Sequence, residues 1–292
     1  MNKKLVSYIQ LHTAVLLFGL TAILGDLISI TAFNLVWWRV LITSLSLLLF
    51  IQFGTKLYKL GKKTLLIFLG IGIIVALHWI TFYGAIKFSN ASVVLAAMAT
   101  ASMFTSLIEP IITGKPFSRL ELLLGMLVIP PMLLIANNID LSMQKGLWIG
   151  LLSALLASIF ACYNKKYVHL ASSIEISFLE ITGAFLFLSL CMPFIKSTSV
   201  EFMPTPTDWI YLVILALACT TLAYVLSVKA LRQLSAFDAN LVVNLEPVYG
   251  ILLAVIILKE HEEMTPNFYW GMILIMLIVF SHPIIKKRMK ID

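Results

Sequence analysis

Long apolar stretches separated by short polar breaks form the main pattern of this chain. They run over approximately residues 8–28, 32–53, 64–86, 91–112, 121–139, 147–168, 174–195, 208–228, 238–258 and 267–285. Because roughly 20 apolar residues at about 1.5 Å rise per residue cross the hydrocarbon core of a bilayer, each stretch predicts a transmembrane helix. The pattern therefore predicts an all-α membrane protein with ten transmembrane helices.

Composition supports the same class. Hydrophobic residues make up 61% of the 292 residues, charged residues make up 12%, and the mean hydropathy is +1.01. Such a chain cannot cover a soluble domain with polar side chains, so we expect its exterior to face the lipid bilayer. The first apolar stretch runs from Leu5 to about Ile28 without a clear cleavage site, which favours an uncleaved span over a signal peptide.

The basic residues are distributed unevenly between alternate loops. If the N-terminus is cytoplasmic, the opposite loops hold Lys87, Lys145, Lys196 and Lys259, Arg39 lies within a span, and all other lysines and arginines face the cytoplasm. The positive-inside rule favours this orientation. It predicts an even number of spans with both termini cytoplasmic. The net charge of +7 is then explained by topology, and no nucleic-acid partner is expected.

The two halves of the chain are weakly similar. Aligning residues 85–88 with 230–233 places Phe104 opposite Tyr249 and brings the flanking apolar stretches into register. If each half holds five spans, the odd number forces the two copies into opposite orientations. This is the inverted-repeat plan of many secondary transporters, which place their binding site near the midplane between the repeats.

Several short motifs support a family resemblance. They are Leu17-Phe18-Gly19, Trp38-Arg39, the Ala-Ile-Lys and Ala-Leu-Arg steps before the fourth and ninth stretches, and Glu246-Pro247 followed by Leu258-Lys259-Glu260. With them, essentially the whole chain resembles the drug/metabolite transporter superfamily, specifically its EamA-type members. The resemblance implies two EamA-like five-helix repeats, residues 1–140 and 141–292, around a central cavity in the cell inner (plasma) membrane. It also implies alternating access and the transport, often outward, of amino acids, their derivatives or other small metabolites.

The ninth stretch carries an unusual polar group, made of Asn240, Asn244, Glu246 and Pro247. A carboxylate at membrane depth is unfavourable unless it faces a cavity or a partner, so Glu246 is a candidate ligand for a substrate ammonium or a proton. The two asparagine amides would form hydrogen bonds with whichever group lies beside Glu246. The structural alternative is that Glu246 forms an ion pair with a residue of another helix. Pro247 predicts a kink. The matching Ala101-Ser102 of the first half has no proline, so any kink there needs another cause.

Two charged residues, Arg39 and Glu180, occupy matching places in the second and seventh stretches. One interpretation is a structural ion pair between them or with a neighbouring acid. The other is that Arg39 binds a substrate carboxylate through two hydrogen bonds while an acid binds the amine. Opposite charges a few ångströms apart would suit a zwitterion.

One histidine and three aromatic residues complete the candidate site. His78 is a candidate proton relay or cavity ligand, although a buried histidine often serves only as a hydrogen-bonding group. Trp79, Tyr83 one turn later, and Tyr224, which aligns with Trp79, pack against lipid or line the cavity. In a cavity they would stack on an apolar or cationic group.

These observations favour a secondary transporter of small polar metabolites such as amino acids or their derivatives, with export as the favoured direction. No phosphate-binding loop is present, so energy would come from a gradient, with protons as a candidate coupling ion. The aromatic residues with Glu246 leave a multidrug-type exporter of lipophilic cations as the alternative. An intramembrane enzyme is less favoured, because neither a Gly-x-Ser-x-Gly nor a His-Glu-x-x-His motif occurs. A passive channel is also less favoured, because it predicts no tight polar site around Glu246. No catalytic residue, metal or cofactor is expected.

Overall fold

The computed structural model of this protein describes most of the chain. The described residues are 3–51, 57, 60–195, 202–243, 245–259 and 264–288. Within them, helix is the only regular secondary structure, and helices occupy each of the predicted apolar ranges. The predicted all-α class is therefore confirmed for this part of the chain.

The first half contains the helices α1 to α7. They are α1 (Lys3–Leu27), α2 (Ala32–Ile51), α3 (Lys62–Phe88), α4 (Ala91–Met98), α5 (Ala101–Thr113), α6 (Arg119–Met126) and α7 (Ile129–Ala136). The second half contains α8 (Gln144–Tyr167), α9 (Ser173–Cys191), α11 (Pro206–Ala216), the π-helical turn η4 (Leu217–Leu222), α12 (Ala223–Ala230), α13 (Ala236–Val243), α14 (Glu246–Leu253), the π-helical turn η5 (Ala254–Leu258) and α15 (Pro266–Arg288).

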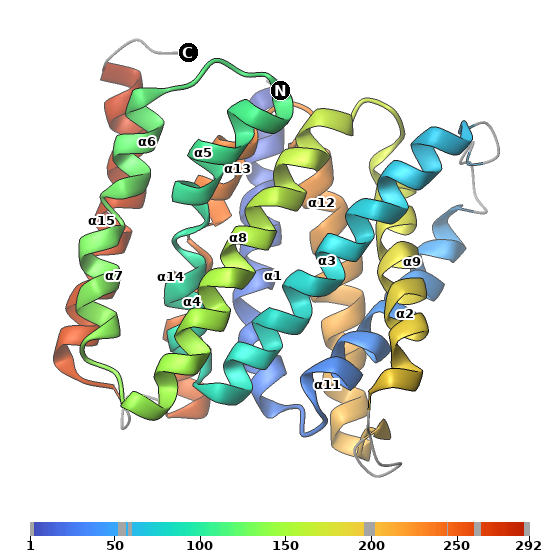
Figure 1. Ribbon diagram of the computed structural model, residues 1–292, viewed down its shortest axis with the longest axis horizontal. Coiled ribbons are helices and arrows are strands. Elements are labelled where there is room, and N and C mark those ends of the chain that lie inside the picture. Colours follow the sequence, from blue (N-terminus) through green and yellow to red (C-terminus); the bar gives the residue numbers. More distant parts are fainter. Residues whose placement is uncertain are drawn as a thin grey trace.

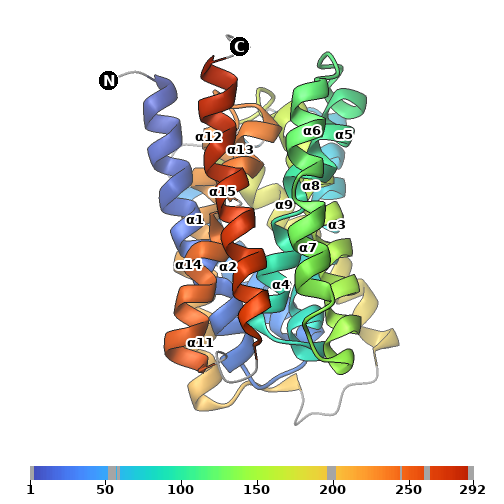
Figure 2. The ribbon, with the colours of Figure 1, turned by 90° about the vertical axis from the view of Figure 1, so that its left-hand side faces the viewer.

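The helices form one bundle in which elements from the two halves are intermixed (Figure 1). Helix α3 packs along α8 and α9 of the other half, and α1 packs against α12 and α14. Helix α15 lies at one edge of the bundle beside α7. Helix α1 begins and α15 ends at the same end of the bundle, as the two perpendicular views agree (Figures 1 and 2).

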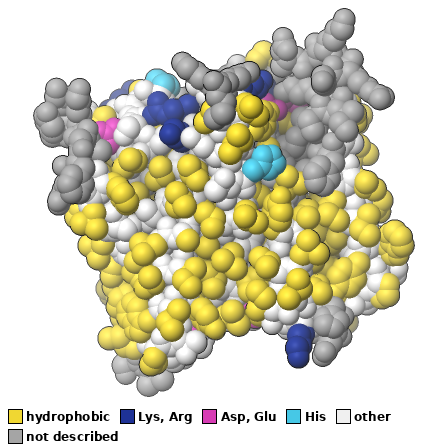
Figure 3. All heavy atoms as spheres, turned by 180° about the vertical axis from the view of Figure 1, so that it is seen from behind, with side chains coloured by type: hydrophobic (Ala, Val, Ile, Leu, Met, Phe, Trp, Pro, Cys, Tyr) yellow, Lys and Arg dark blue, Asp and Glu magenta, His cyan; other side chains and the backbone are white. Residues whose placement is uncertain are grey.

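The outer surface is suited to lipid. Among the described residues, 7 helical stretches are long and apolar enough to cross a membrane, and two shorter apolar helices cover Glu246–Leu258 and Pro266–Ile278. Hydrophobic side chains cover the middle of the face seen in Figure 3, and basic side chains lie towards its upper and lower edges. This is the surface of a multi-pass membrane protein, since hydrocarbon excludes unpaired charge from the central belt.

Two spans are interrupted at corresponding places. The break between α4 and α5 falls at residues 99–100, and in the second half α13 ends at Val243 and α14 begins at Glu246. The helix starts Ala91 and Ala236, and the restarts Ala101 and Glu246, are each 145 residues apart. The two halves therefore share an interrupted helix in the same register.

The two interruptions have different local causes. In the first half, Thr100 Oγ1 donates to the Ala97 carbonyl at 2.7 Å, and Thr105 Oγ1 donates to the Ala101 carbonyl at 2.7 Å. Such hydrogen bonds from threonine to the preceding turn can bend a helix, and this break forms without a proline. In the second half, Pro247 occupies the second position of α14, where its missing N–H needs no partner. The chain has a break there rather than the predicted kink in a continuous helix.

Glu109 ties α5 to the beginning of α13. Its Oε1 accepts a hydrogen bond from the Ala236 amide at 2.8 Å, and its Oε2 accepts one from the Phe237 amide at 3.0 Å. Lys115 Nζ lies 3.5 Å from Glu109 Oε2 and 2.9 Å from Glu121 Oε1. Burial lowers the pKa of Lys115, but the hydrogen bond to Glu121 and the neighbouring carboxylates outweigh this and raise it. The cluster stabilises the N-terminus of α13, where negative charge is favourable.

Glu109→Gln is expected to lower the free energy of unfolding by about 1–3 kcal/mol, because an amide offers one acceptor oxygen to two buried N–H donors. The measurement is the thermal midpoint of the purified protein in detergent. Glu121→Gln is the matched control and should have a smaller effect, since the amide oxygen still accepts from Lys115. Equal midpoints for Glu109→Gln and the wild type would contradict this role.

Candidate functional site

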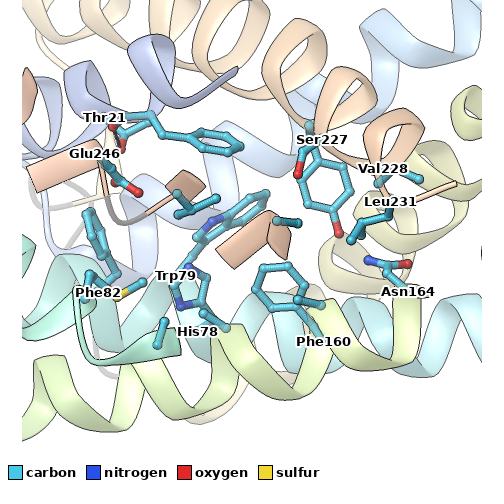
Figure 4. Close-up of a pocket in the computed structure, with 18 of the residues that line it drawn as sticks. Thr21, His78, Trp79, Phe82, Phe160, Asn164, Ser227, Val228, Leu231 and Glu246 are labelled. Carbon is cyan, nitrogen blue, oxygen red and sulfur yellow. Dashed lines mark hydrogen bonds between the residues drawn. The ribbon is translucent and has the colours of Figure 1, made fainter. Parts of the chain in front are cut away.

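A cavity of about 90 Å³ lies where α1, α2, α3, α8, α12, α13 and α14 meet. Its polar lining comes from Thr21, Arg39, His78, Asn164, Ser227 and Glu246. One water occupies roughly 10–15 Å³ on this scale, so the cavity has room for a small molecule of several non-hydrogen atoms. In Figure 4, Glu246 and Thr21 lie at one end of the cavity and Asn164 and Leu231 at the other, with Trp79, His78 and Phe160 between them.

Arg39 on α2 is held in place by neutral partners. Its Nε donates to Thr220 Oγ1 at 2.7 Å, and its Nη1 donates to Tyr83 Oη at 2.6 Å. The guanidinium carbon lies 4.0 Å from the centroid of the Trp79 ring. Only 2% of the residue is exposed, so a full positive charge is buried against an aromatic face. Guanidinium groups held in this way are suited to planar carboxylates.

Glu246 is the first residue of α14 and is 6% exposed. Its carboxylate lies at a helix N-terminus, which favours negative charge, and it lines the same cavity as Arg39. Glu246 and Arg39 both lie in the described part of the chain, and no salt bridge joins them, so they are not in ion-pair contact. The helix–helix ion pair considered for Glu246 is thus not formed in this part of the chain.

Glu180 on α9 does not line the cavity. Its Oε2 accepts a hydrogen bond from Tyr224 Oη at 2.5 Å and another from Asn164 Nδ2 at 3.1 Å. The ion pair between Arg39 and Glu180, which was one of the interpretations left open, is not formed, because each charged group is held by a tyrosine and a second neutral side chain instead.

The charged residue and its tyrosine recur in the two halves. Arg39 bonds to Tyr83 and Glu180 bonds to Tyr224, and both pairs are 44 residues apart in the sequence. In each half, the charged residue lies on one membrane span and the tyrosine on the following span. The two halves thus present the same framework with opposite charges.

His78 and the aromatic residues form the wall of the cavity. His78 Nδ1 lies 2.8 Å from Ser153 Oγ, and the hydroxyl also donates to the His78 carbonyl at 3.0 Å. The His78 ring lies 5.4 Å from that of Phe160, and the Trp79 ring lies 6.2 Å from that of Tyr224 in an edge-on arrangement. Most of the lining is therefore apolar, with a few polar groups at defined places, as is usual for small-molecule sites.

Residues 144–281 match the model of the EamA-like transporter family. The chain carries an EamA-like transporter domain. The predicted family resemblance is thereby confirmed over these residues, which are slightly less than half of the chain, and the match indicates a membrane transporter. One chain of known structure, titled only as the crystal structure of a protein, superposes with a TM-score of 0.72 over 98% of this chain and 99% of its own. Its sequence identity is 12%, so it shows a shared fold alone. No curated protein sequence matches the chain.

Most of the predicted site residues meet at the cavity. Arg39, His78, Trp79, Tyr224 and Glu246 line it directly. Two other predicted residues do not line the cavity but form hydrogen bonds with residues that do: Tyr83 with Arg39, and Glu180 with Tyr224. Asn240 lies on α13, but its side chain is not described, and Asn244 lies outside the described residues. Their predicted role stays a prediction.

Several residues at or beside the cavity could not be singled out from the sequence. Thr220 and Ser153 are the partners of Arg39 and His78, and Phe160 lies against His78. Asn164 was noticeable as a lone amide in an apolar stretch, but nothing in the sequence placed it beside Glu180. Hydroxyl and phenyl side chains are common in membrane helices, so only the packing of α8 and η4 against α2, α3 and α9 reveals them.

Proposed function

We propose that this protein is a secondary transporter that moves a small metabolite by alternating access. In this proposal, ten membrane spans form two inverted five-helix repeats, residues 1–140 and 141–292, with the cavity between them. Three observations support the repeats: the interrupted helices in matching register, the charged residue and tyrosine 44 residues apart in each half, and the common end at which α1 begins and α15 ends. An even number of spans follows from the last of these.

The proposed substrate is a small zwitterion, such as an amino acid or one of its derivatives. The observation that carries this proposal is that Arg39 and Glu246 line one cavity without forming an ion pair. A substrate carboxylate would bind the guanidinium, and its amine would bind the Glu246 carboxylate, so that both charges are neutralised only when the ligand is present. The aromatic wall would pack against the substrate side chain.

A lipophilic cation is the second candidate substrate. Trp79, Phe82, Phe160 and Tyr224 give the cavity the aromatic surface that cations prefer. However, the buried guanidinium of Arg39 would repel a ligand that carries only positive charge. We therefore favour the zwitterion.

The proposed setting is the cell inner (plasma) membrane, with both termini cytoplasmic and transport directed outward. The uneven distribution of basic residues supports this orientation. The loop that carries Lys115 lies at the same end of the bundle as the first residues of α1, as the orientation requires.

The test is thermal stabilisation of the purified protein by a panel of amino acids, amines, organic cations and nucleotide sugars. We expect zwitterions to raise the midpoint in the wild type and not in Glu246→Gln. Asp140→Asn, a change of the same kind on an exposed residue, should respond like the wild type. Stabilisation by lipophilic cations alone would replace the zwitterion with the second candidate. If a ligand stabilises Glu246→Gln to the same extent as the wild type, Glu246 does not bind that ligand.

A further inference from the structure

Glu180 is a buried acid that no cation of the described residues contacts. It is fully buried, and its hydrogen bonds come from Tyr224 and Asn164, both to the same oxygen, Oε2. The second oxygen, Oε1, has no hydrogen-bond partner in the described part of the chain. A lone ionised carboxylate in such surroundings is strongly unfavourable.

A second buried acceptor next to Glu180 is also unsatisfied. Asn164 donates through Nδ2 to Glu180, while its Oδ1 has no hydrogen-bond partner among the described residues. Asn164 is 1% exposed. Two neighbouring acceptors therefore lack a donor. A proton on Glu180 would remove the charge and convert the unpartnered Oε1 from an acceptor into a donor.

No charged side chain among the described residues forms a hydrogen bond or an ion pair with Glu180. The elements packed against α9 include α2, α3 and α12. Their buried titratable groups are Arg39, His78, Tyr83 and Tyr224. Arg39 and Tyr83 bond to each other and His78 bonds to Ser153, which leaves Tyr224 as the titratable group on Glu180.

We propose that Glu180, with Asn164 and Tyr224, forms a proton-binding site that is linked to the substrate cavity. Both partners of Glu180 line the cavity, whereas Glu180 itself does not. An ionised carboxylate holds the tyrosine hydroxyl and the asparagine amide tightly, and a protonated one accepts more weakly. Uptake of a proton from water would thus release two hydrogen-bonding groups towards a cavity ligand, and loss of the proton would withdraw them.

This linkage is reciprocal, so a ligand that bonds to Tyr224 or Asn164 would also strengthen proton binding at Glu180. The proton site and Glu246 are separate, since Asn164 and Glu246 lie at opposite ends of the cavity in Figure 4. A proton and a substrate amine would therefore not compete for one carboxylate. The coupling role rests on the proposed transport function, whereas the proton site itself does not.

The proton site is tested by infrared spectroscopy of the purified full-length protein, with the proton itself as the probe. We expect a carbonyl stretch of a protonated carboxylic acid that disappears reversibly as the pH is raised. Glu180→Gln should lose this band completely, and Glu246→Gln and Asp140→Asn should retain it. If Glu180→Gln removes no such band at any pH at which the protein is folded, the proposal is overturned.

Tyr224→Phe provides a second test that does not require the Glu180 variant to fold. Loss of the tyrosine hydroxyl bond should shift the frequency of the same band upwards, and an unshifted band would also overturn the proposal. Ligand stabilisation of the wild type, measured across the same pH range, tests the coupling. We expect the stabilisation to increase at acid pH in the wild type and to be independent of pH in Glu180→Gln. If the band of the protonated acid is present but no ligand stabilises the protein, the transport proposal is overturned and the proton site is retained.

Discussion

Gly72→Ala is expected to destabilise the protein by about 3 kcal/mol or more, because it would force α3 and α9 apart. A Cβ on Gly72 would lie 2.1 Å from the Glu180 carbonyl oxygen and 2.9 Å from the Ala184 amide nitrogen. Both neighbours are backbone atoms, which cannot rotate away. Gly183 on α9 makes the reciprocal approach, with a Cβ there falling 2.4 Å from the Leu69 carbonyl oxygen. The thermal midpoint and the yield of folded protein in detergent are the measurements.

Gly70→Ala is the matched control for Gly72→Ala. Gly70 lies two residues earlier on the same helix, and a Cβ there meets nothing within 4 Å. Since alanine is favoured over glycine in a helix interior by about 1 kcal/mol, this substitution should be neutral or slightly stabilising. Equal midpoints for the two variants would show that α3 and α9 do not approach as closely as described. The comparison also bears on the proton site, because displacement of α9 would carry Glu180 away from Tyr224.

Arg39→Lys is expected to weaken the binding of a carboxylate ligand about 10- to 100-fold, on the basis of 1.5–3 kcal/mol for hydrogen bonds to a charged group. Lysine keeps the charge but cannot donate to Thr220 and Tyr83 while also facing the cavity. The guanidinium also stacks on Trp79, and an ammonium would lose this planar contact. The measurement is the ligand concentration that gives half of the maximal thermal stabilisation.

Arg119→Lys controls for the loss of a guanidinium, because Arg119 is exposed at the beginning of α6 and lies away from the cavity. It should bind ligand like the wild type. If Arg39→Lys binds the stabilising ligand as tightly as Arg119→Lys does, Arg39 is a structural residue and the ligand carboxylate must be bound elsewhere. Retained binding of cations together with lost binding of zwitterions would instead support the two-charge site.

Sequence reasoning located the candidate residues better than their partners. A charge stranded in an apolar stretch is conspicuous, so Arg39, Glu180 and Glu246 were selected from the sequence. Their pairing could not be read from it, because each partner lies on a helix that is distant in the chain. Thr220, for example, is 181 residues from Arg39. A pairing of Arg39 with Glu180, one of the alternatives that the sequence left open, is absent for this reason: opposite charges in matching places of two repeats need not be in contact.

The two interrupted helices differ in whether the sequence predicted the interruption. Pro247 signalled a disturbance beside Glu246, and the structure has a break there. The corresponding break at residues 99–100 has no proline signal. A threonine hydrogen bond to the preceding turn lies at this break, but Thr13 and Thr81 make the same kind of bond in continuous helices, so a threonine in the sequence does not predict a break.

The sequence by itself determined that this protein is a bundle of apolar helices with a few isolated charges inside it. Helix and membrane burial follow from local properties, since each segment must satisfy its own backbone and match the lipid around it. The tertiary structure alone decided that Arg39 and Glu246 share a cavity unpaired, and that Glu180 lies behind it with two unsatisfied acceptors nearby. Those relations depend on close packing between distant helices, which the glycines of α3 and α9 permit and which no single segment encodes.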